Sequence, residues 1–166
     1  MTTFTVLKFP TVGGAQTMPG ILQQFQEQRP IQIEDGAILT WPRGARHPRI
    51  KQLSELTGVG ALDEGFWGML FGLLFSVPFF GATSGTVFGP LADHFAHYGI
   101  DEGFIKQVRD QITEGTSALF LLANEVLLDR VVAIVNNTSF DLISTTLSCE
   151  QEARLRDAFG QEDLVY

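Results

Sequence analysis

The chain is short of cysteine and of charge, and each shortage excludes a class of protein. Cys149 is the one cysteine among 166 residues, which excludes an intramolecular disulfide framework and a cysteine-cluster metal site. Charged residues make up 18%, below the roughly 25% usual for soluble domains. Lysine and arginine number 11 against 19 acidic residues, so the net charge of -8 argues against nucleic-acid binding. With 45% hydrophobic residues, the chain has enough apolar material for one folded domain and is not a disordered protein.

Recognisable catalytic patterns are also missing. The sequence contains no GxSxG or HExxH motif. Asp93, His94 and His97 have helical spacing and could share a metal ion, but no further ligands lie close to them in the sequence. We therefore predict no catalytic residue, no cofactor and no metal, and we do not expect an enzyme.

The shortage of charge is concentrated in one segment. From Gly65 to Ala92, 28 consecutive residues carry no charged side chain. Pro78 divides this run, and a proline inside a helix removes a hydrogen bond and clashes with the preceding turn. As a helix, each half is too short to cross a hydrocarbon core of about 30 Å. The run therefore predicts a helical hairpin with arms near residues 62–77 and 81–97.

Both arms of this hairpin combine small and large side chains. Glycines four residues apart occur on the first arm and again on the second: Gly68, Gly72, Gly81, Gly85 and Gly89. Large aromatic side chains are expected on the opposite faces, among them Phe66, Trp67, Phe71 and Phe75. Because residues four apart share a helix face, the glycines form a flat stripe that permits close approach of a second backbone.

The hairpin must be hidden from water, and its own domain, an identical subunit or lipid would each hide it. We favour burial between identical subunits. A basic cluster precedes the uncharged run and contains Arg43, Arg46, His47, Arg49 and Lys51. These side chains either contact an anionic lipid surface or form a solvated turn that pairs with the acidic half of another subunit. Because no signal peptide is recognised, we expect a location in the cytoplasm or at the cytoplasmic face of the inner membrane.

The segments on either side of the hairpin predict an α+β body. Strands are expected at residues 4–9, 31–41, 49–53, 117–123 and 139–147, with a bulge at Gly36. Helices are expected near residues 21–28, 101–112, 129–136 and 149–159, with Asp101 capping the second and Ser148 the last. This order suits a ferredoxin-like βαβ…βαβ antiparallel sheet with an inserted glycine-rich apolar helical hairpin and a C-terminal helix. We expect a single domain in three parts: a first βαβ half (1–56), the hairpin (57–100), and a linking helix with the second half and C-terminal helix (101–166).

Several stretches together resemble a known family. They are TGVGAL (57–62), FWG (66–68), LFGLLF (70–75), YGID (98–101) with Phe104, SALFL (117–121), TLS (146–148) and QE (151–152). They resemble an uncharacterised bacterial family, domain of unknown function 1269, whose members are often labelled predicted membrane proteins. The resemblance implies a compact α+β body with a glycine-rich insertion, and it implies no catalytic residues.

These observations together predict a non-enzymatic protein that associates with itself through the glycine-rich hairpin, at or in the inner membrane. Its expected partners are further copies of the chain and membrane lipid, and not nucleic acid. The alternative is a regulatory module that binds a small molecule between subunits, which is an analogy with other ferredoxin-like dimers.

Overall fold

A computed structural model describes residues 2–16, 18, 20, 33–52, 64–75, 95–124, 129, 133 and 140–159. The elements within these residues are β1 (Thr2–Phe9), β2 (Ile33–Thr40), β3 (Arg49–Gln52), α3 (Glu64–Phe75), α5 (Glu102–Gln111), β4 (Ser117–Asn124), β5 (Asp141–Thr146) and α7 (Cys149–Phe159). The five predicted strands are all present, so the alternation of β-branched and aromatic residues located them correctly. The expected helices near residues 21–28 and 129–136 lie outside the described residues, apart from Asp129 and Ala133.

The strands form one antiparallel sheet in the order β3-β2-β4-β1-β5. At its centre β1 pairs with β4 so that Phe4 lies opposite Leu122 and Val6 lies opposite Phe120. On its outer side β1 pairs with β5, and Val6 there lies opposite Ile143. The expected α+β class with an antiparallel sheet is therefore confirmed.

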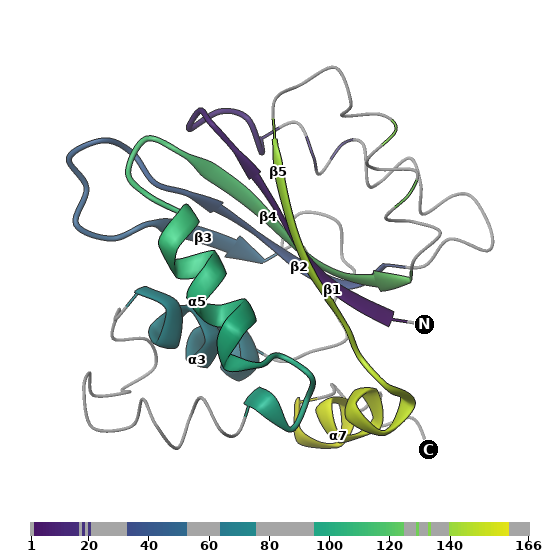
Figure 1. Ribbon diagram of the computed structural model, residues 1–166. Helices are drawn as coiled ribbons and strands as arrows, with labels where there is room; N and C mark the ends of the chain where they lie inside the picture. The colour runs from purple at the N-terminus through teal and green to yellow at the C-terminus, as the bar shows by residue number, and fades with distance from the viewer. Residues whose placement is uncertain are drawn as a thin grey trace, which may run out of the picture.

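One face of this sheet carries the main hydrophobic core. Because side chains alternate along a strand, every second residue of β1 and β4 points to this face, including Phe4, Val6 and Phe120. All three helices of the described residues contribute to the same core, and Figure 1 shows α3 and α5 on one side of the sheet. On the opposite face Leu7 and Leu119 are also buried, so the central strands are covered on both sides.

A register irregularity in β2 lies close to the predicted bulge, but not at it. The pairing with β4 shifts between Ile33 and Asp35, whereas Gly36 itself lies in register opposite Leu121. The Asp35 side chain is buried, and its Oδ1 accepts a hydrogen bond from the backbone N–H of Gly36 at 2.7 Å. The glycine is thus next to the irregularity, which a short acidic side chain accommodates by bonding to the local backbone.

Both predicted N-caps are confirmed. The Asp101 carboxylate accepts a hydrogen bond from the backbone N–H of Phe104 at 2.8 Å and begins α5. At α7, the Ser148 hydroxyl accepts from the backbone N–H of Gln151, while the Gln151 side chain accepts from the backbone N–H of Ser148. This reciprocal pair is a capping box, which satisfies two of the free N–H groups at the start of the helix.

Candidate functional site

The first arm of the hairpin, α3, is packed inside its own domain. Phe66, Trp67, Leu70 and Phe71 are each no more than 2% exposed. The Phe4 ring on β1 lies 6.2 Å from the ring of Phe66 and 6.0 Å from that of Trp67. The sequence left three environments open for these aromatic side chains and favoured an interface between identical subunits. In α3 they are instead buried in the core of their own domain.

Further aromatic contacts fix α3 to the middle of the sheet. The Phe71 ring meets Phe120 of β4 edge to face, with ring centres 4.9 Å apart, which is a favoured geometry for aromatic pairs. Trp67 lies against both Phe66 and Phe71. Its indole N–H is buried and has no hydrogen-bond partner among the described residues, so Trp67 contributes to stability through packing.

The outward side of α3 is less covered. Met69 is 40% exposed, and Gly72 and Phe75 are half-buried. These residues are three apart along the helix and so lie on neighbouring parts of its surface. Gly68, by contrast, is buried. Gly68 and Gly72 therefore differ in environment, and Gly72 is the more accessible of them.

Arg109 of α5 holds the C-terminal end of α3. Its guanidinium donates hydrogen bonds to the backbone carbonyls of Leu73, at 2.8 Å, and Leu74, at 3.3 Å. The last carbonyls of a helix have no partner within the helix and carry a partial negative charge, so a cation there is favourable. Arg109 thus fixes the last described turn of α3, immediately before residues 76–94.

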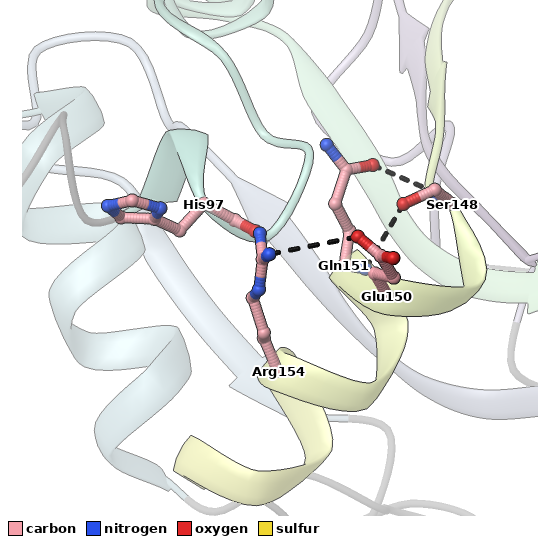
Figure 2. A network of polar contacts seen from close by, with 5 residues as sticks. All are labelled: His97, Ser148, Glu150, Gln151 and Arg154. Carbon is pink, nitrogen blue, oxygen red and sulfur yellow. Dashed lines mark hydrogen bonds and ion pairs between the residues drawn. The ribbon is translucent and has the colours of Figure 1, made fainter.

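A second set of contacts holds the point at which the chain returns. Residues 95–100 form a tight turn in which the N–H of Ile100 donates to the carbonyl of Phe95 at 3.1 Å. Thr145 of β5 donates through its hydroxyl to the carbonyl of Gly99, and Arg154 of α7 donates to the carbonyl of His97. Figure 2 shows Arg154 reaching from α7 towards His97 while also pairing with Glu150. We call the two sets of contacts, at Leu73–Leu74 and at His97–Gly99, the hairpin base.

Gly99 is required at this second point by its backbone and by its surroundings. Its φ is +88°, a conformation that residues with a Cβ rarely adopt. A Cβ built there would also lie 2.8 Å from Oε1 of Gln151, the atom that caps α7. A side chain at position 99 would therefore disturb both the turn and the cap of α7.

The residues considered for a metal site do not form one within the described residues. His97 is exposed, while Asp93 and His94 lie outside the described part of the chain. Among the residues that the structure describes, no group of three histidine, cysteine or acidic side chains could hold a metal ion. Next to His97, Tyr98 is buried against Phe95, and this burial raises the pKa of its phenol above the usual value.

The basic cluster lies on the loop that joins β2 to β3 and on β3 itself. Arg43, Arg46, Arg49 and Lys51 are all exposed, as is His47. Trp41, which begins this loop, meets Phe75 at the end of α3 edge to face, with ring centres 5.6 Å apart. The basic loop and the end of α3 are thus neighbours, although they are more than twenty residues apart in the sequence.

The three glycines expected on the second arm, Gly81, Gly85 and Gly89, lie outside the described residues. Within the described part of the chain, no helix has both the length and the apolar character needed to cross a membrane. The longest apolar helix there is α3, with 12 residues.

Sequence reasoning missed the residues that make the hairpin base. Arg109 and Arg154 are recognisable from sequence only as basic residues on helices. Their partners are carbonyls 35 to 57 positions away along the chain, and no local pattern predicts such pairs. The glycine of YGID was the available signal, because glycine commonly follows the last turn of a helix.

Two comparisons gave no match: no curated protein and no solved structure resembles the chain closely enough to be informative. A family model described as "Protein of unknown function (DUF1269)" matches residues 61–160, which is more than half of the chain and spans α3, the hairpin base, β4 and β5. The protein therefore belongs to this family of unknown function, as its sequence motifs had suggested.

Proposed function

We propose that this protein is non-enzymatic and associates with itself through the hairpin of residues 57–100, at the cytoplasmic face of the inner membrane. The observation that carries the proposal is the hairpin base. The core holds α3 and the return turn at His97–Gly99 in fixed positions, and 17 uncharged residues, Ser76 to Ala92, connect them.

The base supports an assembly role because it fixes the described residues on both sides of the predicted hairpin tip. Each end is held by backbone carbonyls that accept hydrogen bonds from a neighbouring helix or strand. A segment whose two ends are already fixed loses less conformational entropy on binding than a segment with free ends, and this favours specific association.

The pattern of exposure supports the same role. The apolar side chains of α3 that face the sheet are buried within one chain, so their burial does not require a partner. The outward side, with Met69 exposed and Gly72 accessible, continues in sequence into the second arm, where glycines recur every four residues. Small residues at this spacing let two helices approach closely.

The basic loop supports a position at a membrane surface. Four exposed cations, Arg43, Arg46, Arg49 and Lys51, lie on the loop and strand beside the end of α3. Each basic side chain near an anionic leaflet contributes about 1 kcal/mol of attraction. The rest of the chain is acidic, which favours this loop as the surface that approaches lipid.

The strand order supports the finer assignment of the fold. Without β3, the order is β2-β4-β1-β5, with every pair antiparallel. Two interleaved βαβ halves of the ferredoxin-like plan give this order, and β3 extends the sheet beside β2.

The substitution Gly85→Leu tests the hairpin. A leucine at this position separates the close-packed backbones, and we expect mass photometry to show at least a tenfold weaker assembly than the wild type. Gly20→Leu is the matched control, because a Cβ at Gly20 meets nothing within 4 Å. Unchanged assembly of Gly85→Leu would show that the hairpin is not the contact between copies.

The membrane part has its own measurement. Flotation of the wild-type protein with vesicles of phosphatidylglycerol should recover more protein than flotation with neutral phosphatidylcholine vesicles. Salt at about 0.5 M shortens the Debye length to about 4 Å and should abolish this difference. Equal recovery with the two kinds of vesicle would show that the protein does not bind anionic lipid, and the proposal would then be limited to self-association in water.

A further inference from the structure

The sheet ends in two strands of different character. In the part of the chain that the structure describes, β3 pairs only with β2, and β5 pairs only with β1. An edge strand presents backbone N–H and C=O groups to which another strand can bond, and proteins commonly protect such edges with charge or short length.

The β3 edge has this protection. The strand is four residues long, and two of its residues, Arg49 and Lys51, are exposed cations. A second β3 placed against it would bring four positive side chains together, so pairing at this edge is unfavourable.

The β5 edge lacks it. The strand has six residues, Asp141–Thr146, with no proline and no cation. Its one charged residue, Asp141, already has a partner, since its Oδ2 lies 3.8 Å from Nζ of Lys8 on β1. Leu142 on this strand is 45% exposed and, with Met69, is one of two large hydrophobic residues exposed among the described residues.

We propose that β5 pairs antiparallel with β5 of a second copy of this chain, so that two five-stranded sheets become one. The inference extends the proposed function and shares its premise of self-association, but it uses β5 and not the hairpin. Main-chain hydrogen bonds along the edge supply the attraction, and the exposed Leu142 gains cover from the partner strand on the same face of the joined sheet.

The charges on the strand allow a second copy as the occupant, because the acidic residues of two paired strands stay well apart. A two-fold axis perpendicular to the sheet places either residue 143 or residue 144 opposite itself. The two Asp141 residues then lie four or six positions apart, about 13–20 Å at the rise of a strand. This exceeds the Debye length of about 8 Å at physiological salt, so the acids do not repel each other appreciably although each chain carries a net charge of -8.

Hydrogen–deuterium exchange measured by mass spectrometry at low and high protein concentration tests the inference. In an unpaired edge strand, alternate amide N–H groups point away from the sheet and exchange quickly. We expect the outward-pointing amides of residues 141–146 to exchange at least tenfold more slowly in the concentrated sample, and the amides of residues 49–52 to exchange at the same rate in both.

Leu142→Lys should return the exchange of β5 in the concentrated sample to the rate of the dilute one, because a cation then occupies the joined face. The control Gln107→Lys adds the same charge at an exposed position of α5 and should behave as the wild type. If the β5 amides of the wild type exchange equally at both concentrations, or if Leu142→Lys keeps the protection, the inference is wrong.

The hairpin variant separates this result from the proposed function. Protection of β5 that persists in Gly85→Leu supports the edge contact even if the hairpin proposal fails. Loss of assembly in Gly85→Leu, with wild-type β5 exchange independent of concentration, removes the edge contact and leaves the hairpin proposal standing.

Discussion

At the scale of single residues, the hairpin base depends on a glycine at position 99. Gly99 has a positive φ and lies against the Gln151 side chain that caps α7, whereas Gly44, with φ +84°, has open space around its missing Cβ. These two glycines therefore share a backbone conformation and differ in their surroundings.

This pair allows the two costs of a side chain to be separated. Gly44→Ala should lower the free energy of unfolding by about 1–2 kcal/mol, the cost of a left-handed conformation with a Cβ. Gly99→Ala should cost about 1 kcal/mol more, because the methyl group displaces Gln151 and weakens the cap of α7. Urea unfolding measures both, and equal losses in the two variants would contradict the coupling between turn and cap.

At the scale of elements, α3 shows what the sequence can and cannot predict. A helix that is apolar on all sides has the same sequence pattern in lipid, between subunits or in a core. The environment of α3 is determined by the face of the sheet that carries Phe4 and Phe120, and both residues are more than forty positions away along the chain. By contrast, Asp101 and Ser148 cap their helices through contacts three residues away, and these were predictable.

Two adjacent residues of α3 test its burial. Leu70 is completely buried and Met69 is 40% exposed. We expect Leu70→Ala to lower the free energy of unfolding by about 2–5 kcal/mol, since it removes packed methyl groups and leaves a cavity. Met69→Ala should change it by less than about 0.5 kcal/mol. Thermal or urea unfolding of the monomer at low concentration measures both, and similar values for the two variants would show that α3 does not pack on the sheet as described.

At the scale of the whole molecule, stability at high pH depends on the phenol of Tyr98. Its burial raises the pKa of the folded protein above the value of about 10 expected in the unfolded chain. The folded state therefore keeps its proton where the unfolded state has released it. The stabilisation is complete below pH of about 10 and is lost as the pH rises through the folded pKa.

Unfolding in urea at pH 9 and at pH 11 should consequently show a larger loss of stability for the wild type than for Tyr98→Phe. The phenylalanine keeps the ring that packs against Phe95 and removes the titrating group. Identical losses in the two proteins would show that the phenol does not link folding to pH in this range.

The difference between the two sheet edges has a further consequence for the size of any assembly. The proposed pairing through β5 would use a two-fold axis and occupy that edge on both copies, so that among the described strands the two β3 strands would be the edges left over. Arg49 and Lys51 on each β3 discourage addition of a third sheet. The cations of this short strand would thus limit the assembly to two copies, because they oppose the continued addition of strands that produces fibrils.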